Sequence, residues 1–343
     1  MLNAYTSHDL VAFHITSRAE NAPQAADLLT DFAGRPRIDQ DELDRERGVV
    51  VQEIARANDQ PAALAEHLID AAAFGDHPLG RPVLGTTEHI RDTFTREAIL
   101  KFRARRWSPQ HGAAFAVGNL KALDGQLEDL FERFEAHANP DPYEPAPSFS
   151  PRVLVRERDS NQSHLRMAYR PRIEVSDPSQ RAALTIYSTL LGGSMGSRLF
   201  DEIREQRGLA YSVNSIGHAY ADVPTLQLSA GLESSKCVEA YARMREIVTE
   251  LRQDGPTESE VERARAYAAG ARAIAFENTG AVARHAAQQA VVYGEEVDPD
   301  STIALLDRVT VADVREVAAG IADELSIAVV GPHTAEELES ATE

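Results

Sequence analysis

The chain has 343 residues, a formal net charge of −19 and a single cysteine, Cys237. Its length predicts about two domains, and its acidity argues against nucleic-acid or anionic-membrane binding, which needs clustered Lys and Arg. One cysteine excludes an internal disulfide, and no apolar run approaches the ~20 residues that span a bilayer. Since the amino terminus also lacks a signal-peptide pattern, we expect a cytoplasmic location.

The first part of the sequence predicts one strand followed mainly by helices. The strand is expected at residues 3–17, and the helices are expected at residues 21–33, 39–57, 61–73 and 95–106, followed by a strand at 112–117 and a helix at 121–137.

A proline-rich stretch interrupts the chain after these elements. It reads ANPDPYEPAPSFSPR, and its five prolines disfavour a helix and favour an extended connector. We therefore predict an amino-terminal domain at residues 1–137, a linker at 138–152 and a carboxy-terminal domain at 153–343.

The second part predicts a sheet and several helices. We expect strands at residues 152–158, 163–170, 209–220, 224–232 and 325–330, and helices at 178–191, 197–206, 236–253, 257–276, 279–292, 299–307 and 311–322.

The two parts resemble each other. LNAYTS from Leu2 corresponds to LAYSV from Leu209, and AVGN from Ala116 corresponds to AVVG from Ala328. Between these pairs, the acidic helix DQDELDRERGVVVQEIARAN corresponds to TESEVERARAYAAGARAIAFEN. The offset changes only from 207 to 212, as expected for a duplication with small insertions.

The duplication also predicts a difference between the copies. In the second copy, 58 residues (151–208) precede LAYSV, whereas Met1 alone precedes LNAYTS in the first. We therefore expect the first copy to lack its initial two strands and two helices, which would leave a sheet edge and an apolar face exposed.

Four segments carry a specific resemblance. NAYTS, ERGVVVQEI, HPLGRPVLGT and GGSMGSRLFDEIREQRGLAYSV occur in this order, and they resemble the pitrilysin/insulinase zinc metallopeptidase family, including bacterial relatives of mitochondrial processing peptidase. The resemblance implies an α+β fold with two homologous domains, each a mostly antiparallel sheet packed against helices, which together form half of a clam-shell. It also implies a metalloendopeptidase that acts on peptides or unfolded polypeptides.

The family pattern assigns a metal role to one helix of this chain. In the family, zinc is bound by an inverted HxxEH helix and by a glutamate from a later helix, seven residues after another glutamate. Glu46 and Glu53 have this spacing, which places both carboxylates on one helix face. The resemblance therefore implies that Glu53 is the third zinc ligand and that Glu46 supports it. Without the resemblance, two glutamates on an acidic helix are ordinary solvated residues.

The histidine motif itself does not occur in the sequence. None of the eleven histidines begins HxxEH or HExxH, and the nearest approach is ALAEH, which ends in Glu66 and His67. Because ALAEH follows Glu53, whereas the family motif precedes that position, we reject Glu66 and His67 as a site. One carboxylate does not hold a catalytic zinc, so we expect this chain alone to bind no stoichiometric zinc and to be inactive as a peptidase.

Four further residues match substrate-binding positions of the family. The strand that carries NAYTS pairs with the substrate backbone there, which assigns Asn3 and Ala4 by position. Arg207 and Tyr211 in RGLAY resemble an arginine–tyrosine pair that contacts the substrate. The alternative for all four is an ordinary structural role.

Three hypotheses about function stay open at this point. The chain is a zinc endopeptidase whose sequence starts late, a non-catalytic subunit that pairs with an HxxEH-bearing subunit, or a degenerate fragment without activity. The first two imply a peptide or unfolded polypeptide as substrate and a homo- or hetero-oligomer with a peptidase-family subunit, without nucleic acid or membrane.

Overall fold

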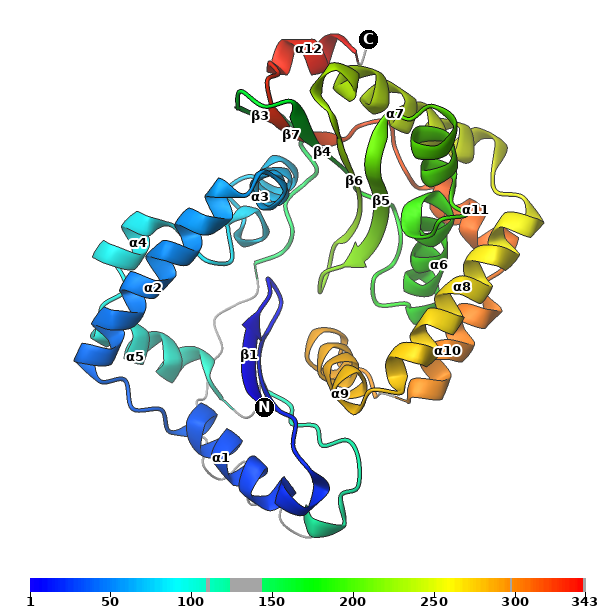
Figure 1. Ribbon diagram of the computed structural model, residues 1–343. Coiled ribbons are helices and arrows are strands. Elements are labelled where there is room, and N and C mark those ends of the chain that lie inside the picture. Colours follow the sequence, from blue (N-terminus) through cyan, green and yellow to red (C-terminus); the bar gives the residue numbers. More distant parts are fainter. Residues whose placement is uncertain (109–111, 124–143, 297, 342–343) are drawn as a thin grey trace. The chain divides into compact units, whose positions relative to one another are not determined.

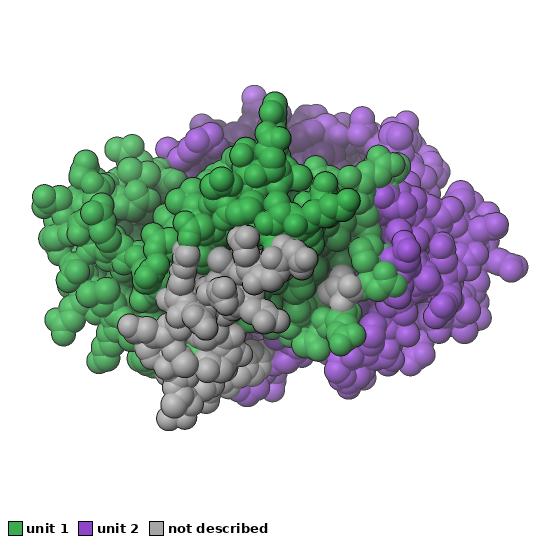
Figure 2. Space-filling model, turned by 90° about the horizontal axis from the view of Figure 1, so that it is seen from below, with its two compact units in different colours: residues 1–55, 83–144, 274–299 green, residues 56–82, 145–273, 300–343 purple. Residues whose placement is uncertain are grey.

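The computed structural model describes residues 1–108, 112–123, 144–296 and 298–341. The chain forms two compact units that are not continuous in sequence (Figure 2). Unit 1 contains residues 1–55, 83–144 and 274–299, and unit 2 contains residues 56–82, 145–273 and 300–343. No helix in the described part of the chain is long and apolar enough to cross a membrane.

Unit 2 is built on a five-stranded sheet with the order β3-β7-β4-β6-β5 (Figure 1). The β3–β7 pair is parallel, and the other neighbouring strands are antiparallel. The strands are β3 Val153–Glu157, β4 Gln162–Tyr169, β5 Ala210–Ala219, β6 Pro224–Glu233 and β7 Ser326–Gly331.

Helices cover both faces of this sheet. On one face the packed elements are α6 Pro178–Ser188, η6 Thr189–Gly193, η7 Phe200–Gln206, α7 Cys237–Asp254, α8 Glu258–Phe276, α10 Pro299–Arg308 and α11 Val311–Ala319. Helix α3 Pro61–Phe74 lies on the other face against β7 and β4, and α12 Ala335–Ser340 ends the described chain.

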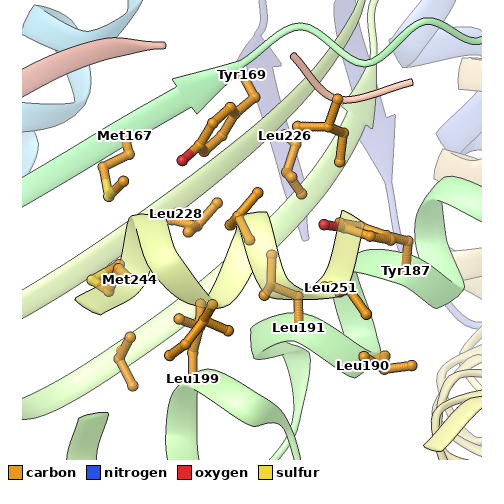
Figure 3. Close-up of a cluster of buried hydrophobic side chains, with 14 of the residues drawn as sticks. Met167, Tyr169, Tyr187, Leu190, Leu191, Leu199, Leu226, Leu228, Met244 and Leu251 are labelled. Atoms are coloured by element: carbon orange, nitrogen blue, oxygen red, sulfur yellow. The ribbon is translucent and has the colours of Figure 1, made fainter. Parts of the chain in front are cut away.

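The main core of unit 2 follows from strand alternation. Leu165, Met167 and Tyr169 on β4 point to the same side as Leu226 and Leu228 on β6, and all five are at most 2% exposed. Figure 3 shows Met167, Tyr169, Leu226 and Leu228 of these strands beside Tyr187 of α6 and Met244 and Leu251 of α7. Period-2 alternation on the strands and period-3.6 repeats on the helices therefore meet in one apolar layer.

Unit 1 contains far less sheet. Strands β1 Leu2–Thr6 and β2 Val11–Ile15 form a two-stranded antiparallel hairpin. The helices are α1 Ala22–Gly34, the first part of α2 Gln40–Asp59, α4 Thr87–Asp92, α5 Arg96–Arg106 and α9 Thr279–Gln288, which continues as η9 Gln289–Tyr293. The order hairpin, helix, helix occurs at β1-β2-α1-α2 and again at β5-β6-α7-α8, as the duplication predicts.

The α+β fold class is confirmed, and three element predictions need correction. The expected strand at 3–17 is the β1–β2 hairpin, because the chain turns between Thr6 and Val11. Residues 112–117 form no strand, and they pair with neither β1 nor β2. The short helices α4 and α12 were not predicted, because six residues are too few to show a helical period. Most of the expected helix at 121–137 and part of the linker at 138–152 lie outside the described residues.

Candidate functional site

Strand β1 presents an open edge that could accept another strand. Met1 and Thr16 exchange backbone hydrogen bonds, and the Ser7 N–H donates to the Leu10 carbonyl. Antiparallel alternation therefore directs the N–H and C=O groups of Leu2, Ala4 and Thr6 away from β2. In the described part of unit 1, no other strand pairs with this edge.

Asn3 partly blocks this edge. Its Oδ1 accepts a hydrogen bond of 2.9 Å from the Ala4 N–H, which is one of the outward-directed groups. Both residues are exposed. An incoming strand would have to displace the Asn3 amide to reach the Ala4 N–H. Asn3 and the incoming strand would thus compete for the same donor.

Glu46 and Glu53 are both exposed on α2, two helical turns apart. Their neighbours are paired, because Glu42 contacts Arg45 and Asp44 lies 2.6 Å from the Arg47 guanidinium. Within the described residues, neither the Glu46 nor the Glu53 carboxylate has a hydrogen-bond or ion-pair partner. Both carboxylates are therefore available to a ligand.

These residues alone do not fit a catalytic zinc ion. Such an ion needs three protein ligands and an open position, and the described residues contain no group of three or more His, Cys, Asp or Glu side chains that could hold a metal. Glu66 and His67, which we reject as a metal site from the sequence, lie on α3. The Glu66 carboxylate is 3.7 Å from the Arg166 guanidinium, on the face of the sheet that α3 covers. Among the described residues, Glu53 therefore belongs to no cluster of side chains that could hold a metal ion.

Arg207 lies at the end of η7, where a glycine stops the helix. Gly208 has a φ of +59°, which favours glycine. The Leu209 N–H donates to the Ile203 carbonyl at 2.8 Å, and this bond across the glycine closes the helix end. The Arg207 side chain is exposed, and its guanidinium has no partner among the residues that the structure describes.

Tyr211 occupies a β-bulge in β5. Ala210 pairs with Leu232 and Ser212 pairs with Gly231, so Tyr211 is an extra residue in the strand. Because of this bulge, Ala210 stays buried while Tyr211 and Ser212 both face outward. The Tyr211 side chain is 49% exposed, and its hydroxyl is unpaired within the described chain.

The phenol of Tyr211 lies directly over Gly231 of β6. A Cβ atom at Gly231 would be 2.6 Å from the Tyr211 hydroxyl oxygen and 2.7 Å from its Cζ atom. The absence of a side chain at Gly231 therefore leaves the space in which the tyrosine ring lies.

An ion-pair network ties η7 to α7. The Arg243 guanidinium contacts Glu202 of η7, and it also donates to Glu246 at 3.0 Å and to Glu250 at 2.6 Å. Hydrogen bonds to Glu250, Glu202 and Glu246 raise the pKa of Arg243 above its ordinary value, although burial opposes the shift. These charge-assisted bonds fix the helix that ends at Arg207.

A second pair fixes the start of the same region. The Arg198 guanidinium donates to both oxygens of Glu260 on α8, at 2.7 and 3.0 Å. Burial would raise the pKa of Glu260, but the bonds from Arg198 and Thr257 outweigh it and lower this pKa to about 2. The segment between Arg198 and Arg207 is thus tied to α8 through Arg198 and to α7 through Glu202.

Lys236 and Gly231 were not among the sequence-predicted residues. Lys236 donates from Nζ to the Gly208 carbonyl at 3.0 Å, directly beside Arg207. A lone glycine inside an alternating strand indicates a close approach of another group, so Gly231 could have been found from the pattern of β6. Lys236 carries no local signal, because its contact spans 28 residues.

Comparisons with known proteins agree with this architecture. Residues 1–87 match the family "Insulinase (Peptidase family M16)", and residues 93–267 match "Peptidase M16 inactive domain". An uncharacterized zinc protease of Streptomyces coelicolor is 30% identical over 341 residues, which cover 96% of this chain and 74% of that protein.

Solved structures show the same fold at low identity. A peptidase M16 inactive domain from Pseudomonas fluorescens superposes with a TM-score of 0.81 at 19% identity, covering 97% of this chain and 81% of that chain. A chain of complex III from Candida albicans gives a TM-score of 0.83 at 15% identity, covering 99% and 85% of the two chains. With the two family matches and the zinc-protease relative, these likenesses show that the chain belongs to the M16 family, the insulinase family of zinc metallopeptidases.

Proposed function

We propose that this chain binds extended, unfolded polypeptides for an M16 zinc metalloendopeptidase. The observation that carries the proposal is the pair Arg207 and Tyr211, two exposed side chains without described partners at the end of η7 and in the β5 bulge. Cleavage would require zinc-ligating histidines, which the HxxEH motif supplies in the family and this sequence does not contain.

The open edge of β1 is a peptide-binding surface of unit 1 by itself. Backbone hydrogen bonds to a sheet edge bind an extended peptide with little demand on its sequence. The groups of Leu2, Ala4 and Thr6 that point outward would pair with the polypeptide. The Asn3 amide would release the Ala4 N–H when the peptide binds. Until then, its hydrogen bond to Ala4 disfavours pairing of this edge with the strands of other proteins.

Arg207 and Tyr211 supply side-chain donors. A guanidinium and a phenol hydroxyl both donate hydrogen bonds, and peptide carbonyls accept them. If such donors face a carbonyl on which charge develops, they stabilise the transition state more than the ground state. This role is specific to polypeptide substrates, because it needs backbone carbonyls and no particular side chain.

Glu53 is the residue that this chain would contribute to a zinc site. Its carboxylate is exposed and has no described partner, and the same holds for Glu46 on the same face of α2. A bound zinc ion would supply Lewis-acid chemistry and an activated water. Glu53 would then be one of its oxygen ligands.

The first experiment measures binding of a permanently unfolded polypeptide. Fluorescein-labelled lysozyme, reduced and carboxamidomethylated, is a suitable probe, because its positive charge suits a chain of net charge −19. We expect Arg207→Ala to weaken binding about tenfold and Tyr211→Phe about threefold in fluorescence anisotropy, as for lost hydrogen bonds.

Matched controls come from the same unit. Arg156→Ala removes an exposed arginine from β3, at the opposite edge of the sheet, and Tyr267→Phe changes a tyrosine on α8 that is 53% exposed. The proposal fails if the wild-type chain does not bind the probe, or if Arg156→Ala weakens binding as much as Arg207→Ala.

A second candidate function is a non-catalytic partner subunit. The exposed apolar side chains of unit 1 favour it, since apolar surface that one protein leaves exposed is commonly covered by a partner. They include Leu28, Phe32, Phe94, Leu100 and Phe102. The occupant would be a peptidase-family subunit with its own HxxEH motif, in a homo- or hetero-oligomer.

Elemental analysis and reconstitution separate the two candidates. A subunit without its own metal site should contain less than stoichiometric zinc and should not cleave the unfolded probe. Adding an HxxEH-bearing homologue should produce cleavage, and Arg207→Ala should reduce the rate of the complex. Stoichiometric zinc and cleavage by the purified chain alone would contradict the partner-subunit function.

A further inference from the structure

The end of β6 and the turn that follows it contact the Arg207–Tyr211 segment at two separate points. Lys236 donates from its ammonium group to the carbonyl of Gly208 at 3.0 Å. Gly231 lies under the phenol of Tyr211. One short piece of chain thus contacts both the backbone next to Arg207 and the phenol of Tyr211.

The Lys236 contact acts on the backbone next to Arg207. The Gly208 carbonyl follows the last turn of η7, where helix carbonyls lack partners within the helix. A lysine that donates to such a carbonyl also complements the negative end of the helix dipole. Lys236 itself lies 3.8 Å from Glu233, and both side chains are more than 40% exposed, so this ion pair is a weak surface contact.

The contact with Gly231 determines where the Tyr211 side chain can lie. Any Cβ at this position would come within 2.7 Å of two phenol atoms and within 2.8 Å of the Ser212 hydroxyl. Because Gly231 is buried and held in the ladder by Ser212 and His164, its backbone has little room to move. The tyrosine ring and the Ser212 hydroxyl would therefore have to move instead.

We propose that Lys236 and Gly231 are positioning residues that set the relative placement of the Arg207 guanidinium and the Tyr211 hydroxyl. This inference rests on the proposed binding of extended polypeptides. Successive carbonyls along an extended chain have a fixed spacing of about 3.3 Å per residue. Two donors contact such a chain together more readily if the range of their spacing is restricted. The Lys236 contact holds the backbone that follows Arg207, and the missing side chain at Gly231 leaves the phenol of Tyr211 its place over β6.

The positioning role of Lys236 is tested with three variants in the anisotropy assay with the unfolded lysozyme probe. Lys236→Met should weaken binding about fivefold, whereas Lys236→Arg, which keeps a cationic donor, should restore it to within about twofold of wild type. Lys101→Met, at an exposed lysine of α5, is the control and should leave binding unchanged. If Lys236→Arg binds as weakly as Lys236→Met, donation to the Gly208 carbonyl is not the cause.

Hydrogen exchange gives a readout that does not depend on the ligand. The amides of Gly208 and Leu209 donate to the Arg204 and Ile203 carbonyls. Lys236→Met should speed exchange at these two amides, while exchange in β4 and α7 stays at the wild-type rate. Unchanged exchange at Gly208 and Leu209 would overturn this part of the inference.

The positioning role of Gly231 is tested by a double-mutant cycle with Tyr211. Gly231→Ala should weaken binding about as much as Tyr211→Ala. In the Tyr211→Ala background, where the ring no longer occupies the space, Gly231→Ala should have almost no further effect. Additive losses would show that Gly231 acts through something other than Tyr211.

The outcomes separate this inference from the proposed function. If wild type binds the probe and Arg207→Ala and Tyr211→Ala weaken binding, the proposed function holds. Lys236→Met and Gly231→Ala then decide the positioning role. If Arg207→Ala and Tyr211→Ala bind as wild type, the proposed function itself has failed, whatever Lys236→Met does to hydrogen exchange.

Discussion

Units 1 and 2 contain the same hairpin–helix–helix motif, yet they bury very different amounts of apolar surface. In unit 2 this motif adds β5 and β6 to a sheet of five strands, and tens of apolar side chains are buried around it. In unit 1 the hairpin β1–β2 stands as a two-stranded sheet. The buried apolar residues that the structure describes there are Ile54, Ile90, Leu123 and Ala286.

The difference shows what the motif needs in order to fold stably. Two strands and two helices have an apolar face but no layer to cover it, and isolated two-stranded sheets are marginal in water. Unit 2 supplies that layer from β3, β4 and β7 and from α6. Unit 1 instead exposes apolar side chains such as Phe32 and Phe102, at 47% and 62%. Stability should therefore differ strongly between the units.

The largest expected effect is a separation of the two unfolding transitions. The single tryptophan, Trp107, lies in unit 1 against Phe13, and the single cysteine, Cys237, is fully buried in unit 2. Burial, with a smaller contribution from Glu337, raises the pKa of Cys237 to about 12, so the folded thiol should resist alkylation. We expect Trp107 fluorescence to change at a urea concentration about 2 M below that at which Cys237 becomes reactive, equivalent to roughly 4–6 kcal/mol.

Coincident transitions would break the comparison. They would mean that the two units unfold as one cooperative body despite their different cores. The same two transitions can also be measured after an HxxEH-bearing M16 homologue has been added. If that partner covers unit 1, the Trp107 transition should move to higher urea and the Cys237 transition should not.

A smaller effect is expected from one leucine-to-alanine change in each unit. Leu228 of β6 is fully buried in the main core of unit 2, whereas Leu28 of α1 in unit 1 is 54% exposed. Leu228→Ala should destabilise unit 2 by about 3–5 kcal/mol, because it leaves a cavity in a close-packed core. Leu28→Ala should change the free energy of unfolding by less than about 1 kcal/mol. Thermal and urea unfolding monitored with both probes measure the pair, and equal losses would show that unit 1 packs better than its exposure indicates.

An ion pair in each unit gives the next comparison. Arg198 and Glu260 in unit 2 have side chains only 20% and 17% exposed, whereas Arg35 and Asp31 in unit 1 are 60% and 57% exposed. Arg198→Ala should cost unit 2 about 2–3 kcal/mol at pH 7, because it leaves a largely buried carboxylate unpaired. Arg35→Ala should cost less than about 0.5 kcal/mol.

The pH dependence of the Arg198→Ala effect has a definite sign. The pKa of Glu260 is lowered in the folded state to about 2, from an ordinary value of 4.5. The stabilisation is therefore complete above about pH 5 and is lost as the pH falls from 4.5 towards 2. The difference between wild type and Arg198→Ala should shrink over that range. A difference that stays constant down to pH 2 would show that Glu260 is not the group responsible.

The comparison also explains which features could be predicted from the sequence. In unit 2, the alternation of β4 and β6 and the helical periods of α6 and α7 are visible, because each element buries one continuous face. In unit 1, residues 112–117 have strand composition but pair with no strand in the described chain. A sequence pattern records the preference of a segment and does not record whether a partner strand is present.

The candidate site divides in the same way. Arg207, Tyr211 and Glu53 could be proposed because they lie in motifs that resemble the M16 family. The bulge at Tyr211 could not be predicted, since it depends on the pairing of Ser212 with Gly231 across the hairpin. The Lys236 contact with Gly208 depends in turn on where β6 ends. Long-range register, which local patterns do not encode, decides both.

The smallest expected effect comes from removing a helix cap. The loss of stability should be similar in the two units, but each change should lower only the unfolding transition of its own unit. Thr310 caps α11 in unit 2 and Thr95 caps α5 in unit 1, each by accepting an N–H bond from the residue three positions later. Either threonine-to-alanine change should cost about 1 kcal/mol. Because α11 packs into the core, Thr310→Ala should lower the Cys237 transition and leave the Trp107 transition in place, while Thr95→Ala should do the reverse. If Thr95→Ala also lowered the Cys237 transition, the stability of unit 2 would depend on unit 1, and the two copies would fold as a coupled pair.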